Sequence, residues 1–193
     1  MGMNEKNTEA IISSWNNYMA DFSLPSWDQI PDLGLYMEQV ITFVRGCLRN
    51  FEDGTEEPVI TASAVNNYVR KKFMPQPVKK RYYRTHLAYL LIICTLKQAI
   101  SIAEIQNMIP VDIEEEELKT FYTSFTIQHK RAAGYFASRF DEFRKDFLSE
   151  VPEENTFLDK KTEITMDIAL VSSFGRMLSR KLLSMYDGGP EEA

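Results

Sequence analysis

The chain has 193 residues, of which 44% are hydrophobic and 12% aromatic, which is enough to bury a core in one or two domains. Its two cysteines and two histidines show no metal-ligand spacing, and its eight glycines form no phosphate-binding loop, so neither a metal nor another cofactor is expected. The apolar runs are too short to span a membrane and no signal peptide pattern opens the chain, which favours a cytoplasmic protein without a membrane partner.

The formal charge of −6 conceals a strongly basic segment at residues 60–110. That segment holds eight basic residues and one acid, Glu104, for a net charge of +7, whereas the rest of the chain holds 14 basic and 27 acidic residues, for −13. Seven of the cations lie between Arg70 and Arg84, with no acid among them. Because charges act over roughly 8 to 10 Å at ordinary salt, such a cluster attracts a polyanion even on an acidic protein.

Two helices are predicted before the basic segment. An amphipathic pattern covers 8–22, a turn with two prolines follows, and an apolar repeat of period near 3.6 predicts a second helix over 32–50. An acidic stretch with Gly and Pro, 52–58, then predicts a loop. We expect residues 1–57 to form an N-terminal helical segment that packs on the core.

The basic segment begins with a helix that Thr61 is placed to cap. Helical spacing predicts that its inward residues are Ala64, Val65, Tyr68 and Val69, and its outward residues Asn66, Asn67, Arg70 and Lys71. Pro75 and Pro77 stop the helical pattern, because each lacks a donor and favours an extended residue before it. Residues 73–83 are therefore expected to form an extended loop or a two-stranded wing.

Two further helices complete the basic segment. Thr85 is placed to cap a helix that runs to residue 97 and is apolar on nearly all sides, so it should be buried. Ser101 and Glu104 form a capping box for a short helix that Pro110 ends. Helix, turn, wing and two helices over 58–110 make the layout of a winged helix-turn-helix.

Residues 111–186 are expected to form a C-terminal helical region for dimerisation or sensing, followed by a disordered tail at 187–193. A long helix begins near 112 with a run of acids in its first turn, and its apolar stripe is rich in aromatic residues as far as 147. A last helix over 162–186 should turn inward Ile164, Ile168, Val171, Phe174, Leu178 and Leu182. Aromatic helices also line effector pockets, so a small-molecule effector is compatible with the pattern but unsupported by it.

An outward helical face with Asn and Arg, followed by a basic wing, suits double-stranded DNA. A helix fits the major groove, where Asn pairs with adenine and Arg with guanine, while flanking cations contact phosphates. We expect base contacts from Asn66, Asn67 and Arg70. Backbone contacts are expected from Lys71, Lys72, Lys79, Lys80, Arg81 and Arg84, with Tyr82 or Tyr83 as a further phosphate donor. Four to six such cations predict a salt slope near −4 to −5 per subunit.

Residues 60–108 resemble the DNA-binding domain of MerR-type regulators. The resemblance rests on VNNYVRKKFMPQP for the recognition helix and the start of the wing, KRYYRTHL for the wing and third helix, and AISIAEIQNMI for the fourth helix. Three features differ from that family. Asn66 stands where the family often has Arg, and Lys72 replaces the usual Gly at the start of the wing. The acidic loop 52–58 separates the first helix from Ile60, whereas the family joins the two closely. The resemblance implies a homodimer in which the long helix after the winged domain pairs across a two-fold axis.

The segments LPSWDQIPDLGLYMEQVI, YVRKKFMPQPVKKRYYR and IICTLKQAISIAEI together resemble a bacterial family called domain of unknown function 1836, over most of residues 24–150. The expected fold is all-α: a MerR-like winged helix-turn-helix with a small β wing, flanked by N-terminal helices and a C-terminal helical pair or bundle. The aromatic stripe of the long helix fits bundle packing at least as well as a simple coiled coil.

The leading hypothesis is a DNA-binding transcriptional regulator that acts as a homodimer. The alternative is a non-catalytic adaptor that uses the winged scaffold and its basic face to bind an acidic protein, which the Asn at position 66 favours. An enzyme is the weakest hypothesis. His86, expected on the surface at the start of a helix, and His129, expected to be partly buried, lack a nucleophile or carboxylate partner at helical spacing.

Overall fold

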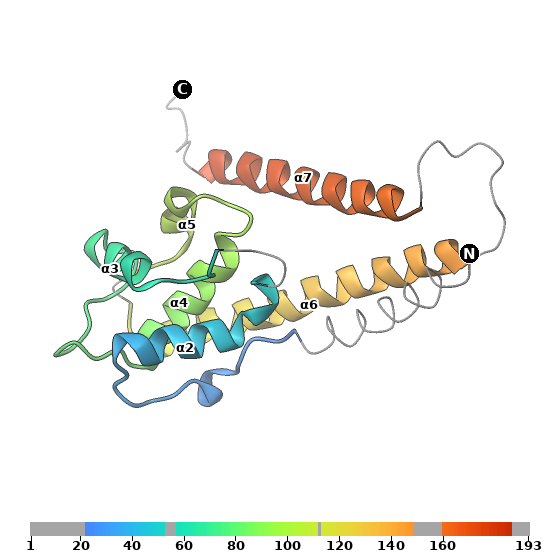
Figure 1. Cartoon of the computed structure of the whole chain (residues 1–193). Helices are drawn as coiled ribbons and strands as arrows, with labels where there is room; N and C mark the ends of the chain where they lie inside the picture. The colour runs from blue at the N-terminus through green and yellow to red at the C-terminus, as the bar shows by residue number, and fades with distance from the viewer. Residues whose placement is uncertain (1–21, 53–56, 112, 149–159, 187–193) are drawn as a thin grey trace, which may run out of the picture. The chain divides into compact units, whose positions relative to one another are not determined.

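The computed structural model describes residues 22–52, 57–111, 113–148 and 160–186. These residues form six α-helices and contain no β-strand, so the all-α class is confirmed for this part of the chain (Figure 1). The helices and two 3-10 turns are η1 Trp27–Gln29, α2 Met37–Cys47, η2 Arg49–Phe51, α3 Ala62–Arg70, α4 Arg84–Leu96, α5 Ile102–Met108, α6 Glu115–Leu148 and α7 Lys160–Tyr186. None of these helices is both long and apolar enough to cross a membrane. The helix expected over 8–22 and the tail at 187–193 lie outside the described residues.

The chain divides into two compact units, and the division falls inside α6. One unit comprises residues 20–134, and the other combines residues 1–19 with 135–193. The hydrophobic core of the first unit takes side chains from η1, α2, α3, α4, α5 and the first part of α6. The described residues of the N-terminal segment and those of the basic segment therefore contribute to one core.

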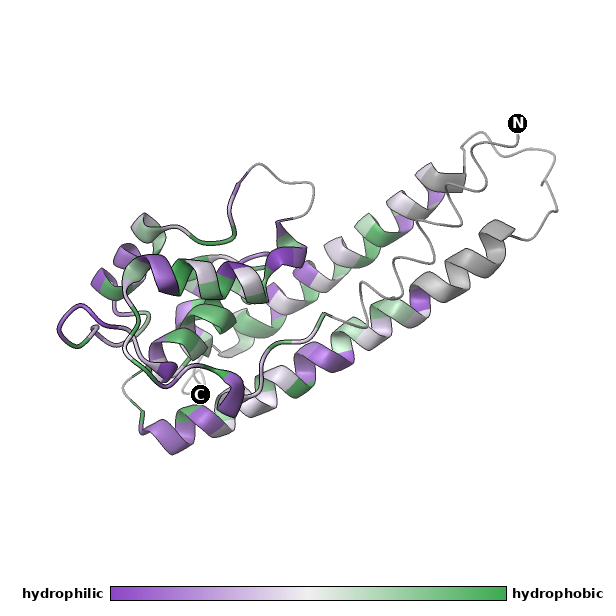
Figure 2. Cartoon of the chain, turned by 60° about the horizontal axis from the view of Figure 1, so that its bottom comes forward, coloured by the Kyte–Doolittle hydropathy of each residue, from purple (hydrophilic) through white to green (hydrophobic). Residues whose placement is uncertain are grey.

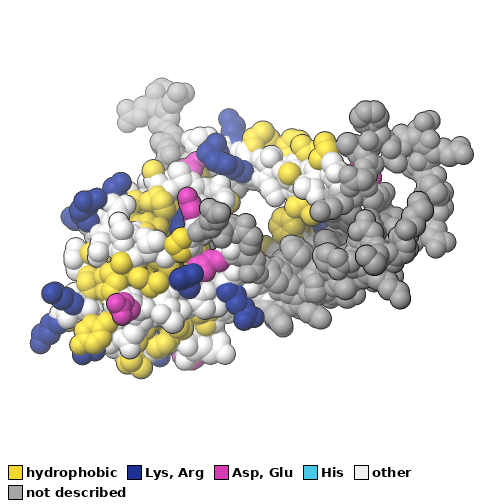
Figure 3. Space-filling model, in the orientation of Figure 1, with side chains coloured by type: hydrophobic (Ala, Val, Ile, Leu, Met, Phe, Trp, Pro, Cys, Tyr) yellow, Lys and Arg dark blue, Asp and Glu magenta, His cyan; other side chains and the backbone are white. Residues whose placement is uncertain are grey.

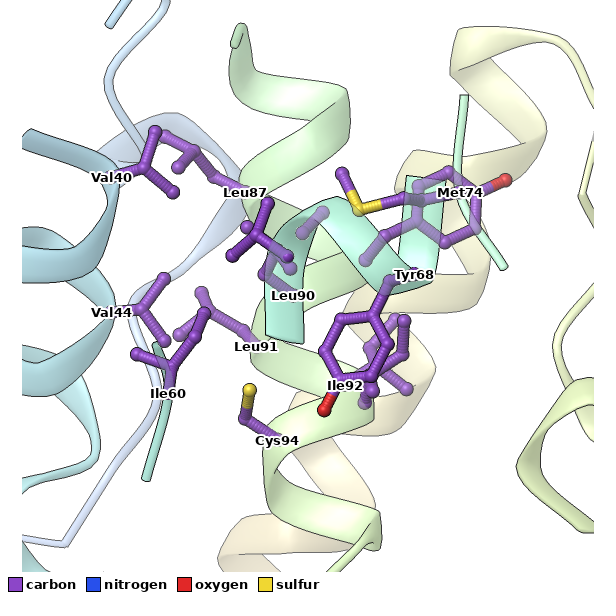
Figure 4. Close-up of a cluster of buried hydrophobic side chains, with 14 of the residues drawn as sticks. Val40, Val44, Ile60, Tyr68, Met74, Leu87, Leu90, Leu91, Ile92 and Cys94 are labelled. Carbon is purple, nitrogen blue, oxygen red and sulfur yellow. The ribbon is translucent and has the colours of Figure 1, made fainter. Parts of the chain in front are cut away.

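Helix α4 lies at the centre of the 20–134 unit. Nine consecutive residues from His86 to Cys94 are buried, which confirms the expectation of a buried helix. Figure 2 shows hydrophobic residues, in green, gathered on the helices of this unit. Val40 and Val44 of α2 point toward this helix from one side, and Tyr68 of α3 packs from another (Figure 4). Because burial of one such side chain contributes about 1.5 to 3 kcal/mol, this cluster holds α2 and α3 in place.

Helix α2 begins at Met37, later than the start at residue 32 that its apolar repeat predicts. The residues before it are extended instead, because the backbone N–H and C=O of Leu35 exchange hydrogen bonds of 2.8 and 2.9 Å with Tyr82. Leu33 and Tyr36, which belong to that apolar repeat, are exposed. A long-range backbone pair thus replaces the first helical turn.

The connection from α2 to α3 is held by the carboxylate of Glu52. Its oxygens accept hydrogen bonds from Arg45 Nε and Nη2 and from the backbone N–H of Val59, at 2.8 to 3.1 Å. Val59 and Ile60 are buried, so the chain is anchored immediately before α3. The acidic loop therefore joins two fixed points of the core.

Most predicted caps are observed. Thr61 accepts a hydrogen bond from the N–H of Ala64 at 3.1 Å, and Ser101 forms the predicted capping box with Glu104. In α4 the N-cap position belongs to Tyr83, not to Thr85 as predicted, because the ring of His86 accepts the Tyr83 N–H at 3.0 Å. The buried His86 side chain thus takes the part that Glu or Gln usually plays at the third helical position of a capping box.

Helix α7 differs from its prediction in the burial of its apolar face. Val171, Phe174, Leu178 and Leu182 were expected to face inward, but they are between 36% and 62% exposed. The position of the helix is close to the predicted one, with a start at Lys160 in place of 162. Helical spacing identifies an apolar face without specifying what covers it.

Candidate functional site

The end of α3 places Lys72 in a conformation that glycine usually adopts. Lys72 has a φ of 58°, its N–H donates to the carbonyl of Val69 at 3.1 Å, and the N–H of Phe73 donates to Tyr68 at 2.9 Å. These two bonds, with the packing of the Phe73 ring against Tyr68 at 6.1 Å between centroids, define a Schellman motif. Lys72 keeps the backbone that a glycine would have there and adds a cation to it.

A second pair of lysines forms the tip of a tight turn. Val78 and Arg81 exchange two backbone hydrogen bonds of 3.1 and 2.9 Å, which leaves Lys79 and Lys80 as the two turn residues. Their φ angles are 49° and 62°, so both are left-handed, as a type I′ turn requires. Asn-Gly is the usual sequence for such a turn, because most other side chains are strained there.

Within the described residues, every non-glycine residue with positive φ is a lysine of the basic segment: Lys72, Lys79 and Lys80. All three side chains are exposed, and none of them forms a salt bridge among the ion pairs found in this part of the chain. Lys and Arg side chains project from the side of the 20–134 unit that carries α3 and the 73–83 segment, at the left of Figure 3. We call Arg70, Lys71, Lys72, Lys79 and Lys80 the basic surface.

The exposed face of α3 lies beside the basic surface. Asn66 and Arg70 are exposed on it, together with Ser63, while Val65 and Val69 are buried on the opposite face. Asn67 is half-buried, and its Oδ1 accepts a hydrogen bond of 2.9 Å from Nη2 of Arg70. Asn67 therefore orients the guanidinium of Arg70, whereas sequence reasoning placed both residues in the same outward role.

Arg81 binds the protein itself. Its guanidinium donates to the carbonyl of Gly34 at 2.9 Å and to the Tyr36 hydroxyl at 2.7 Å, and it lies 4.3 Å from the centroid of the Tyr36 ring. Together with the Leu35–Tyr82 backbone pair, these contacts dock the 73–83 segment on the residues before α2.

Arg84 and the two tyrosines beside it also have structural contacts. The Arg84 side chain is 19% exposed, its Nε donates to the carbonyl of Ile30 at 3.1 Å, and its Nη2 lies 3.8 Å from Asp32. Tyr82 is only 4% exposed, so it belongs to the core. Tyr83 is half-buried and caps α4 through its backbone. The basic stretch thus divides into cations that face solvent and cations that hold the segment in place.

Gly34 allows this docking, and we expect Gly34→Ala to weaken it. A Cβ at position 34 would lie 2.8 Å from Cδ and 3.0 Å from Cβ of Arg81, and 3.2 Å from Cζ of Tyr83. Arg81 must shift away, so the free energy of unfolding should fall by about 1 to 2 kcal/mol in urea denaturation. Gly46→Ala is the matched control, because no atom within 4 Å would meet its Cβ. Equal stability of the two variants would contradict this account.

His86 joins both ends of the 73–83 segment. It is 4% exposed, which corrects the expectation of a surface residue, and its Nδ1 accepts the Tyr83 N–H at 3.0 Å. Nε2 lies 3.1 Å from the carbonyl of Gln76. An acceptor at Nδ1 and a carbonyl at Nε2 require the neutral ring with its proton on Nε2. Burial lowers the pKa of His86, in agreement with a neutral ring.

Because the neutral ring of His86 is buried, we expect the free energy of unfolding to depend on pH. Because the pKa of His86 is lower in the folded state than its usual value near 6.5, the unfolded chain binds the proton more readily. The contribution of the neutral His86 ring to the free energy of unfolding should be fully present above about pH 6.5. It should decline as the pH falls toward the lowered folded-state pKa of His86. Burial also lowers the pKa of His129, which adds to the same slope.

The measurement is urea unfolding at a series of pH values. His86→Gln should make the free energy of unfolding depend less on pH below 6.5. His129→Gln is the matched control, and it should leave the pH dependence due to His86 unchanged. An unchanged slope in His86→Gln would show that the ring is not held neutral by these contacts.

An apolar groove in the same unit bears on the small-molecule effector, which the sequence pattern leaves unsupported. It has a volume of about 470 Å³ and lies among the ends of α4 and α5 and the first half of α6. Its lining includes Leu96, Met108, Phe121, Phe125 and His129. Polar side chains of Thr95, Ser124 and Gln128 line it as well, and Nδ1 of His129 is buried there without a hydrogen-bond partner among the described residues. The volume is that of a small-molecule pocket, so the groove is compatible with a small-molecule effector.

Comparison with protein families gives one match, to the family described as Domain of unknown function (DUF1836), over residues 25–125. The matched range contains η1, α2, α3, the 73–83 segment, α4, α5 and the beginning of α6. Neither curated proteins nor solved structures give a match.

Proposed function

The chain belongs to the DUF1836 family, and we propose that it is a non-catalytic regulator that binds double-stranded DNA through α3 and the basic surface. In this proposal α2 and α3 form the helix-turn-helix, and the 73–83 segment is a MerR-like wing reduced to a single tight turn. The protein binds as a homodimer, so its operator contains two half-sites separated by whole helical turns.

The observation that supports the proposal most strongly is the backbone conformation of the three lysines. Lys72, Lys79 and Lys80 occupy left-handed positions that Gly or Asn would fill at lower cost, roughly 1 kcal/mol for each residue. Residues held in such conformations are concentrated at functional sites. The fold keeps three cations where they destabilise it, and none of the three is in a salt bridge within the part of the chain that the structure describes. Binding of a polyanionic ligand explains why lysines, and not Gly or Asn, occupy these positions.

The shape of the surface favours duplex DNA over other polyanions. The face of α3 with Asn66 and Arg70 is exposed and is available for the major groove, and in this proposal the turn at Lys79 and Lys80 contacts the neighbouring backbone. Asn66 and Arg70 are the base-reading residues in this proposal, and Lys71, Lys72, Lys79 and Lys80 bind phosphates. Asn67, Arg81, Tyr82, Tyr83 and Arg84, all expected to touch DNA, are assigned to positioning the site.

Nonspecific affinity for duplex DNA across a salt series tests the proposal. Four phosphate-binding lysines predict a slope of log K against log salt of about −4 per subunit. Absence of binding even at low salt would refute DNA binding and would favour the adaptor alternative, in which the same cations bind an acidic protein.

A further inference from the structure

Helix α7 presents a continuous apolar face that the described residues of its own unit leave uncovered. Large apolar side chains on it are between 36% and 65% exposed: Met166, Leu170, Val171, Phe174, Met177, Leu178, Leu182 and Met185. At 3.6 residues per turn they fall within about 160° of the helix circumference, with Phe174 near the middle. Ser172 and Arg176 lie on the opposite face. This helix is strongly amphipathic yet unpartnered within the described residues.

The charges at the two ends of this face have opposite signs. Asp167 lies on the same face near the N-terminal end of the helix, and Lys181 lies on it near the C-terminal end. Both side chains are exposed. Between them the centre of the face is apolar from Leu170 to Leu178. A face with an acid at one end and a base at the other is complementary to its own reversed copy.

We propose that α7 is the self-association surface of this protein and that it packs antiparallel against α7 of a second copy. Two-fold symmetry requires that each residue meets its counterpart in reverse order. With the axis beside Phe174, Leu170 lies opposite Leu178 and Asp167 lies opposite Lys181 at both ends. A parallel pair would place Asp167 against Asp167 and Lys181 against Lys181, which the charges disfavour.

The size of the face agrees with a stable interface. About half of each of eight large side chains is exposed, which corresponds to roughly 100 Å² apiece and about 800 Å² for each copy. A specific dimer of standard size buries about 800 Å² on each partner. A face of this area on a monomer exceeds the apolar patches that monomers usually expose.

Sedimentation equilibrium of the full chain, in the absence of DNA, tests this surface. Phe174→Glu should weaken dimerisation by more than about thirty-fold, because it places two charges at the centre of the interface. Ser172→Glu is the matched control, since it adds the same charge to the opposite face and should leave the dimer intact. Circular dichroism of both variants establishes that α7 is still helical. A monomeric wild-type chain, or equal effects of the two variants, would overturn the proposal.

Charge reversal tests the antiparallel orientation. Asp167→Lys and Lys181→Asp should each weaken the dimer, and the double variant should restore it, because the two reversed charges again face each other. No recovery in the double variant would contradict the antiparallel register. The inference deepens the homodimer of the proposed function. Since these measurements contain no DNA, their failure would leave DNA binding by the other unit untouched, and loss of DNA binding would leave the dimer result standing.

Discussion

Replacing Lys79 by Asn and Lys80 by Gly is expected to make the protein more stable and a weaker DNA binder at the same time. Asn-Gly is the preferred sequence of a type I′ turn, so the free energy of unfolding should rise by about 1 to 2 kcal/mol. The loss of two phosphate contacts should reduce the salt slope by about 2 and the affinity near 0.1 M salt by roughly 50-fold. Urea unfolding and a salt series of duplex binding measure the two effects.

Replacement of both lysines by Gln is the matched control for this result. It removes the same two charges but keeps residues that are strained at positive φ, so affinity should fall without the full gain in stability. If the Lys79→Asn/Lys80→Gly variant binds DNA as tightly as the wild type, the wing tip is not part of the DNA interface. A variant that is no more stable than the Gln pair would show that the turn stores no strain.

The local elements of this fold follow from short stretches of sequence. Thr61 and Ser101 cap helices because a hydroxyl placed before an apolar helical repeat reaches the N–H of the third residue. The burial of α4 follows from its lack of a polar face. The positions of α3, α5 and α7 were predicted to within a few residues for the same reason: each depends on neighbours in the chain.

Which cations face solvent and which hold the 73–83 segment depends on contacts between residues far apart in the chain, and no local sequence pattern predicts these contacts. Lys80 and Arg81 are adjacent and both basic, yet one is exposed at the tip and the other lies on Tyr36, 45 positions away in the chain. Gly34 makes that contact sterically feasible, but its spacing from position 81 has no periodic signature. A weak signal is present in the sequence, because Gly34 is a poor helix former and lies just before the observed start of α2.

The roles assigned to α3 lead to the second large expected effect, which concerns Arg70. Once an operator has been selected from random duplex DNA, Arg70→Ala should lower affinity for it by about 1 to 3 kcal/mol. Affinity for unrelated duplex should change much less, because a base contact is lost and most phosphate contacts remain. Asn67→Ala should produce a smaller loss of the same kind, since it frees the Arg70 guanidinium from its 2.9 Å hydrogen bond.

Lys71→Ala is the matched control, because Lys71 is the next residue, is also exposed and carries the same charge. It should weaken specific and nonspecific binding alike and reduce the salt slope by about 1. The ratio of specific to nonspecific affinity therefore distinguishes a base-reading residue from a phosphate-binding one. This ratio should fall in Arg70→Ala and stay constant in Lys71→Ala. Identical ratios would mean that α3 contributes only charge, and that Asn67 holds Arg70 for a reason other than reading bases.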